Sequence, residues 1–244
     1  MRFARNLPPH IPFSMQSILL NLLNRPSRIE KSTRKRIIRT SIKQAGVWFV
    51  DVPRTGSTSI KHDLVKQFGE CFGKSFYREP AKGGEKTTRN RATVEAHSTA
   101  TEVRKLIGAK YFDSVYTFSF VRNPFDRFFS LFHYRQLVGD LDRSISFKRY
   151  VCSLATPRFR DPSTPFFKRP YYLSMCDYLL DEQGQLIIDQ WFKFENRNDS
   201  LSEIVGQTGV HFSGTHLERG KSLESYIDFY DSESKECLRT FSWV

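Results

Sequence analysis

The segment Pro53-Arg54-Thr55-Gly56-Ser57-Thr58-Ser59 concentrates groups that can bind an anion. The β-prone run 47–50 precedes it and apolar residues at helical spacing follow it, so we expect a turn between a strand and a helix. Backbone N–H groups at a helix N-terminus bind anions, and a glycine lets the chain approach closely. The Arg54 guanidinium and the hydroxyl groups add donors. The segment therefore predicts a phosphate-binding turn, with an ordinary capped turn as the alternative.

This turn differs from the phosphate loop of nucleotide triphosphatases, which reads G-x-x-x-x-G-K-[ST]. Asp51 stands at the position of the first glycine, and Ser57 stands at the position of the lysine. The basic residue precedes the glycine instead, as Arg54. The lysine that reaches two phosphates is therefore missing, which disfavours a kinase or an ATPase.

A second strand-turn-helix unit follows farther along the chain. The run Val115–Val121 is rich in β-branched and aromatic residues, which favours a strand. Asn123 is a natural N-cap and Pro124 suits the first helical position, so a helix is expected next. Arg122 at the end of the strand and Ser130 on the helix are candidate phosphate ligands. Taken alone, Arg122 could equally form an ion pair at the surface.

His97 is the candidate general base, because an imidazole exchanges protons near neutral pH. It precedes Thr99-Ala100-Thr101-Glu102, which has capping-box spacing, so we expect it just before a helix. A lone histidine at such a junction is more often held by backbone contacts, and the residues alone leave both interpretations open. The weaker candidates are His62, His133, His211 and His216.

Two longer runs, Phe49–Ser59 and Thr117–Leu131, closely resemble the two signatures with which carbohydrate sulfotransferases bind 3'-phosphoadenosine 5'-phosphosulfate (PAPS). That group includes heparan-sulfate 2-O-sulfotransferases and their bacterial relatives. The segments His97–Glu102 and Asp189–Asn196 are similar to further parts of the bacterial members. The resemblance covers residues 46–240, most of the chain.

The resemblance implies a role for each matching residue. The 5'-phosphosulfate would be held by Arg54, Thr55, Gly56, Ser57, Thr58 and Ser59. The 3'-phosphate would be held by Arg122 and Ser130. His97 would take the proton of the acceptor hydroxyl, and Arg54 would stabilise charge on the departing phosphate oxygen.

The resemblance also implies the reaction and the fold. The reaction is direct in-line transfer of a sulfuryl group from PAPS to a hydroxyl (the EC 2.8.2 class), with no metal. The expected acceptor is a glycan or a sugar-containing small molecule. The expected fold is α/β, a three-layer P-loop-like sulfotransferase fold with a central, mainly parallel sheet. The alternatives are a P-loop-like nucleotide or sugar kinase and a non-catalytic nucleotide- or nucleic-acid-binding protein.

Positive charge is concentrated at the N-terminus. The formal net charge is +12, and residues 1–44 hold ten lysines and arginines against one acid, Glu30. We expect a basic extension over residues 1–44, partly disordered or helical, and a sulfotransferase domain over residues 45–244. Because the charge is confined to the extension and no nucleic-acid module is recognised, nucleic acid is not the expected partner. Weak contact of residues 1–44 with a membrane surface remains an option.

No apolar run reaches the roughly 20 residues that cross a bilayer, and no signal peptide is visible, so we predict a cytoplasmic protein. The four cysteines form neither a CxxC pair nor a Cys/His cluster with metal spacing, which predicts reduced thiols and no metal site.

The remaining segments give further predictions. We expect a loop over 74–93, irregular chain with short helices over 157–176, a hairpin or two short strands at 186–188 and 191–195, and helices at 200–208 and 231–242. Lys221-Ser222 is expected to make further contacts with the cosubstrate.

Overall fold

The computed structural model describes residues 31–72, 94, 96–156, 169–213 and 226–240. Its centre is a parallel sheet with strands in the order β1-β2-β3. The strands are β1 (Val47–Val50), β2 (Tyr116–Val121) and β3 (Gln190–Lys193). In register, Phe49 lies opposite Phe118, and Phe120 lies opposite Phe192. This central parallel sheet among helices confirms the expected α/β fold.

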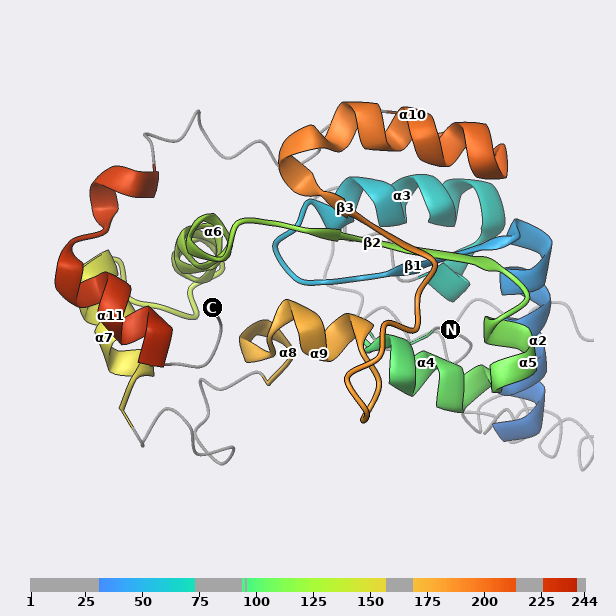
Figure 1. Cartoon of the computed structure of the whole chain (residues 1–244), viewed down its shortest axis with the longest axis horizontal. Helices are drawn as coiled ribbons and strands as arrows, with labels where there is room; N and C mark the ends of the chain where they lie inside the picture. Colours follow the sequence, from blue (N-terminus) through green and yellow to red (C-terminus); the bar gives the residue numbers. More distant parts are fainter. Residues whose placement is uncertain (1–30, 73–93, 95, 157–168, 214–225, 241–244) are drawn as a thin grey trace, which may run out of the picture.

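Helices cover both faces of the sheet (Figure 1). One layer holds α3 (Ser57–Phe68) and α10 (Arg197–Thr208). The opposite layer holds α4 (Ala100–Ile107), α5 (Ala109–Phe112), α8 (Arg169–Tyr172) and α9 (Met175–Leu179). Short 3-10 turns, η1 (Glu70–Phe72) and η3 (Phe194–Asn196), join these elements. The three-layer arrangement agrees with the expected architecture.

Burial from both sides explains the composition of the strands. All four residues of β1 are buried, as expected for a parallel strand covered on both faces. Phe118 and Phe120 of β2 are fully buried in the same core, where Ile60 and Leu64 of α3 pack against the sheet. The apolar runs that predicted the two strands are therefore the centre of the core.

Local sequence signals place the ends of the helices as expected. Thr99 and Glu102 form the predicted capping box at α4, with Glu102 N donating to Thr99 Oγ1 at 3.1 Å and Thr99 N donating to Glu102 Oε2 at 2.8 Å. The side chain of Asn123 accepts from Phe125 N at 3.0 Å and caps α6 (Pro124–Leu137). Gly69 ends α3 with a φ of 87°.

The chain before β3 corrects one expectation. The segment 191–195 is not one arm of a hairpin with 186–188, because β3 pairs in parallel with β2. Leu186 instead makes a single antiparallel bridge with Leu180. A turn lies between Leu180 and Leu186, with Asp181 N donating to Gln185 O at 2.9 Å. A strand this short pairs with whichever neighbour the tertiary fold offers.

A second helical cluster adjoins the carboxyl ends of the strands (Figure 1). It consists of α6, α7 (Phe147–Leu154), η4 (Tyr226–Phe229) and α11 (Ser232–Thr240). Its own core includes Phe129, Phe132 and Phe147. The Tyr230 hydroxyl donates to Phe125 O at 2.8 Å, which ties the C-terminal segment to the start of α6. The helices predicted at 200–208 and 231–242 are confirmed as α10 and α11.

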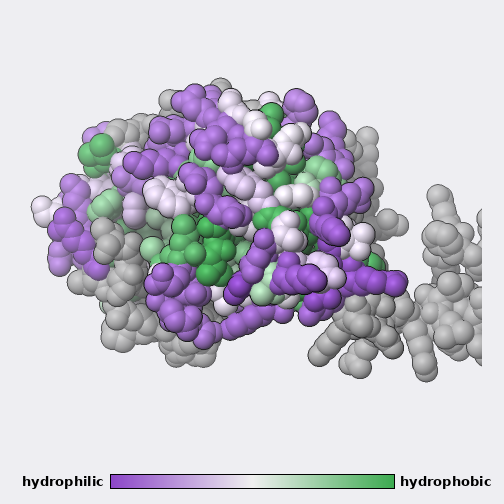
Figure 2. All heavy atoms as spheres, turned by 45° about the vertical axis from the view of Figure 1, so that its right-hand side comes forward, coloured by the Kyte–Doolittle hydropathy of each residue, from purple (hydrophilic) through white to green (hydrophobic). Residues whose placement is uncertain are grey.

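Part of the predicted basic extension packs on the body of the protein. α2 (Lys31–Ala45) contacts β1, α3 and α4, and its Ile38 and Ile42 are buried. Seen from the side of α2 and α5, the described surface is mainly hydrophilic, with apolar atoms gathered near its centre (Figure 2). Within the described ranges, no helix has the length and apolar character needed to cross a membrane. The domain boundary at residue 44 stays a prediction.

Several expectations fall outside the described residues. These are the loop at 74–93, the first part of the irregular chain at 157–176, His216, and Lys221-Ser222. Residues 1–30 also lie outside them.

Two thiols face each other between α7 and α11. Sγ of Cys237 lies 2.7 Å from Sγ of Cys152, and no disulfide joins them in the structure. Partial burial and the neighbouring thiol raise the pKa of Cys152 to about 12, so few thiolates form at neutral pH. Attack of Cys152 on a disulfide should therefore be slow at neutral pH and faster in alkaline buffer.

We expect incubation with glutathione disulfide to join Cys152 and Cys237, removing two hydrogen atoms and yielding reduced glutathione. Because the crosslink spans 85 residues, it should raise Tm by about 5–15 °C. Mass spectrometry of unreduced peptides and thermal melts measure both effects. Cys237→Ser should abolish the rise, while Cys176→Ser, at an exposed cysteine, should preserve it. An unchanged Tm in fully crosslinked protein would contradict this expectation.

Candidate active site at the carboxyl edge of the sheet

The carboxyl ends of all three strands lie at one edge of the sheet, because the strands are parallel. There β1 continues into the turn 51–56 and α3, β2 into α6, and β3 into η3 and α10 (Figure 1). Ligands of open α/β sheets bind outside this edge. The two predicted phosphate-binding segments therefore meet in space.

Arginine side chains hold the backbone carbonyls of the turn 51–56. The three bonds run from Arg127 Nε to Pro53 O (3.0 Å), from Arg122 Nη1 to Arg54 O (3.1 Å) and from Arg197 Nη1 to Gly56 O (3.2 Å). Because the carbonyl and N–H groups of one peptide unit point in opposite directions, these bonds orient the N–H groups away from the arginines. They also bring three positive charges beside the turn, which favours an anion there.

The N-terminus of α3 has no side-chain cap. Gly56 is its N-cap residue, with a φ of 78°, and among the described residues no side-chain capping bond is made there. The helices α4, α6, α7 and α9 are capped by Thr99, Asn123, Ser146 and Ser174. The N–H groups of the first turn of α3 are thus directed at a place where an anion can accept from them.

Gly56 also makes room for an aromatic ring. A Cβ at this position would lie 2.5 Å from Cε2 of Phe194, well inside van der Waals contact. The same Phe194 ring stacks on the Arg122 guanidinium at 4.6 Å. Sequence reasoning missed Phe194 and Arg197 as parts of the site, although the segment 189–196 was singled out.

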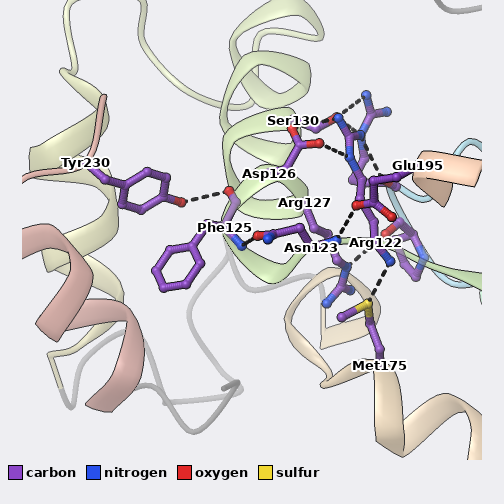
Figure 3. A network of polar contacts seen from close by, with 11 residues as sticks. Arg122, Asn123, Phe125, Asp126, Arg127, Ser130, Met175, Glu195 and Tyr230 are labelled. Atoms are coloured by element: carbon purple, nitrogen blue, oxygen red, sulfur yellow. Dashed lines mark hydrogen bonds and ion pairs between the residues drawn. The ribbon is translucent and has the colours of Figure 1, made fainter. Parts of the chain in front are cut away.

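Arg122 and Ser130 both lie beside the turn, on the side of α6 away from Tyr230 (Figure 3). Nε and Nη2 of Arg122 donate to the Asp126 carboxylate at 2.7 Å and 2.8 Å. With the bond to Arg54 O, these contacts use three of the five guanidinium N–H groups. Two N–H groups of Arg122 thus have no hydrogen bond among the described residues.

The Ser130 hydroxyl connects the two segments directly. Its Oγ accepts from Nε and Nη2 of Arg54 at 3.2 Å and 3.1 Å. Since these bonds use lone pairs of Oγ, the hydroxyl hydrogen of Ser130 can still donate. The residues that sequence reasoning assigned to opposite ends of one nucleotide therefore lie in direct contact.

Two of the predicted hydroxyl ligands brace the turn itself. Thr55 Oγ1 donates to Val52 O at 2.9 Å, and Ser59 Oγ accepts from Arg197 Nη2 at 2.6 Å. Both residues are buried, as is Ser57, whereas Thr58 is partly exposed. Thr55 and Ser59 thus stabilise the loop through their side chains, and their contribution to anion binding is best assigned to their N–H groups.

His97 lies against the start of the same turn. Its Nδ1 lies 3.0 Å from Asp51 Oδ2 and 3.2 Å from Asp51 O. The side chain is 15% exposed, so solvent or a substrate can reach the ring. Sequence reasoning noted Asp51 only as a replacement for a glycine and missed it as a partner of His97.

Asp51 is buried and also pairs with Lys61 of α3, whose Nζ lies 2.5 Å from Oδ2. Burial acts to raise the pKa of the Asp51 carboxyl, but Lys61 and His97 together hold that pKa well below its ordinary value. The carboxylate is therefore ionised at any physiological pH. No residue spacing in the sequence pointed to this cluster.

Aromatic rings connect His97 to Arg54. The Tyr171 ring lies 5.3 Å from the His97 ring and 6.0 Å from the Tyr134 ring. The Arg54 guanidinium stacks on Tyr134 at 4.5 Å. Among the described residues other than glycine, only Arg54 and His97 have a positive φ, at 67° and 59°. Such backbone conformations gather at functional sites, because the surrounding structure must stabilise them.

The other described histidines have different surroundings. His133 packs edge-on against Phe129 and Phe132 in the helical cluster, at 4.5 Å and 5.2 Å. Nδ1 of His62 lies 3.6 Å from Asp63 Oδ1 on α3. His211 is exposed. Within the described part of the chain, no three His, Cys, Asp or Glu side chains gather as a metal site requires. The expectation of a metal-free reaction stays a prediction.

Comparison with known proteins gives one match. Residues 40–210 match the family described as "Sulfotransferase family", and this range includes both predicted phosphate-binding segments and His97. Neither a search among curated proteins nor one among solved structures finds a match.

Proposed function

Because the chain belongs to the sulfotransferase family, we propose that it transfers a sulfuryl group from PAPS to a hydroxyl of a carbohydrate. One observation carries the proposal of PAPS as the donor. Arg54 of the first phosphate-binding segment and Ser130 of the second are hydrogen-bonded to each other. A nucleotide with phosphates on both its 5' and 3' positions can therefore contact both segments at once.

The groups at this edge fit such a nucleotide. The uncapped first turn of α3 offers backbone N–H groups to the 5'-phosphosulfate. Arg122 and Ser130 offer two N–H groups and one O–H group to the 3'-phosphate. Asp126 partly neutralises Arg122 but also fixes its orientation, so the remaining donors are preorganised.

In the proposed mechanism the bound donor supplies an activated sulfuryl group. Nε2 of His97 accepts the proton of the acceptor hydroxyl as its oxygen attacks. The Arg54 guanidinium stabilises negative charge on the phosphate oxygen that leaves. The transfer is in-line with no covalent enzyme intermediate, so alignment and fixed charge provide most of the rate. The carbohydrate acceptor is proposed from the resemblance of the two signatures to those of carbohydrate sulfotransferases.

Calorimetric titration tests the proposed donor. We expect 3'-phosphoadenosine 5'-phosphate to bind about 10–100-fold more tightly than 5'-AMP, because charge-assisted bonds to the 3'-phosphate contribute about 1.5–3 kcal/mol. Arg122→Gln should remove most of that preference and weaken the affinity for 5'-AMP by a smaller factor, because the turn keeps its bonds to Arg127 and Arg197.

Arg104→Gln is the matched control, since Arg104 also pairs with one aspartate, Asp113, but on the exposed surface of α4. It should leave both affinities unchanged. Equal affinity of the wild-type protein for the two nucleotides would refute PAPS as the donor. Binding of the nucleotide without any sulfuryl transfer would favour a non-catalytic nucleotide-binding protein.

A further inference from the structure

Asp51 lies where it can select one tautomer of His97. Nδ1 of His97 faces two oxygens of Asp51, the carboxylate Oδ2 at 3.0 Å and the backbone O at 3.2 Å. An ionised carboxylate and a carbonyl can only accept hydrogen bonds. The neutral imidazole makes these contacts only with its proton on Nδ1. Nε2 then carries a lone pair and can accept a proton.

Lys61 completes the charge balance of this cluster. Its Nζ bonds the same Oδ2 that faces His97, so Asp51 and Lys61 form a neutral ion pair beside the ring. A buried carboxylate without a cation would favour a second proton on the imidazole, because an uncompensated buried charge is costly. With Lys61 present, His97 can be neutral without leaving such a charge. The phenols of Tyr171 and Tyr178 also interact electrostatically with Asp51, and both have a raised pKa, mainly through burial.

The other contacts of Asp51 indicate that its carboxylate binds the side chains of His97 and Lys61. Oδ1 is buried and has no hydrogen-bond partner among the described residues, so the carboxylate caps neither the turn nor α3. His97 meanwhile adopts a φ of 59°, which its surroundings must stabilise. The bonds to Asp51 on one side and the Tyr171 ring on the other hold the imidazole in place.

We propose that Asp51 is a positioning residue that holds His97 in the tautomer with its proton on Nδ1, and that Lys61 supports it by balancing the carboxylate charge. The inference rests on the proposed function, in which Nε2 of His97 is the base. It adds two supporting side chains, Asp51 and Lys61, to the two proposed catalytic side chains, His97 and Arg54.

Nitrogen NMR of the full chain, labelled with ¹⁵N-histidine, tests the tautomer without any substrate. The wild-type protein should show His97 with its proton on Nδ1, and His97→Asn identifies the signals by removing them. In Asp51→Asn a neutral amide oxygen accepts more weakly than the carboxylate, and the NH₂ group can turn toward Nδ1, so the fraction of His97 with its proton on Nε2 should rise. Asp63→Asn is the matched control. Asp63 is another buried aspartate, whose Oδ2 accepts from Ser213 N and Oγ. This variant should leave the His97 signals unchanged.

Kinetics provide the second readout. In Asp51→Asn we expect kcat for sulfuryl transfer from PAPS to a desulfated glycosaminoglycan to fall by about 10²–10⁴-fold, as for a base left in the wrong tautomer. The affinity for 3'-phosphoadenosine 5'-phosphate should stay the same. A wild-type proton on Nε2, or a folded Asp51→Asn protein with wild-type kcat, would overturn the proposal. Absence of transfer by the wild-type protein would instead count against the proposed function, because the tautomer is measured independently.

Discussion

Replacing His97 with asparagine is expected to reduce kcat by about 10²–10⁴-fold, the usual contribution of a general base. Asparagine tolerates the positive φ of this position better than most residues do. Its amide can also keep a hydrogen bond to Asp51, while the group that corresponds to Nε2 is lost. The change therefore removes the base and preserves the local structure. Transfer of labelled sulfate from PAPS to a desulfated glycosaminoglycan measures the effect.

The affinity of His97→Asn for 3'-phosphoadenosine 5'-phosphate shows whether a lower kcat reflects the loss of the base or the loss of nucleotide binding. Calorimetry should give the same Kd for His97→Asn as for the wild-type protein, because the proposed phosphate ligands lie in the turn 51–56, on α3, after β2 and on α6, and the asparagine can keep the hydrogen bond to Asp51. His211→Asn changes an exposed histidine outside the site and should leave both kcat and Kd unchanged. If His97→Asn retained wild-type kcat, His97 would not be the base.

Replacing Gly56 with alanine should strongly weaken nucleotide binding and lower the stability of the protein. The new Cβ would lie 2.5 Å from Cε2 of Phe194, so the turn or the ring must move. Since the φ of 78° adds backbone strain for alanine, we expect a loss of about 2–4 kcal/mol in the free energy of unfolding. Denaturant unfolding and calorimetric titration measure the two effects.

Gly209→Ala separates backbone strain from steric overlap. Gly209 has a similar φ of 70°, at the end of α10, but a Cβ there would meet nothing within 4 Å. This variant should lose only about 1–2 kcal/mol of stability and bind nucleotide normally. Equal losses of stability in Gly56→Ala and Gly209→Ala would show that the overlap with Phe194 does not destabilise the protein.

The two glycine variants also test how the site is assembled. Phe194 contacts both Gly56 and Arg122, so it links the turn after β1 to the residue after β2. If the ring moves to accommodate the added methyl group, the Arg122 guanidinium loses its stacking partner. Any nucleotide binding that survives in Gly56→Ala should therefore be weakened more for 3'-phosphoadenosine 5'-phosphate than for 5'-AMP.

The sequence by itself determined the two strand-turn-helix units and the ends of their helices. The capping box of Thr99 and Glu102 and the N-cap at Asn123 depend on residues within three positions of each other. The buried strands can be predicted because each is a short run rich in apolar, β-prone side chains. Such signals are local, so they can be interpreted before the chain is folded.

Only the tertiary structure decided which groups surround the turn. Asp51 and His97 are 46 residues apart, and Arg197 reaches Gly56 across 141 residues. No periodicity encodes such pairs, because they depend on how the strands align and how the helices pack on them. The same reason explains why the sequence left a hairpin and two short strands open at 186–195, since a four-residue strand carries too little pattern to specify its neighbour. The sequence thus identified the two segments proposed to bind phosphate, while packing at the carboxyl edge supplied the charged partners that orient them.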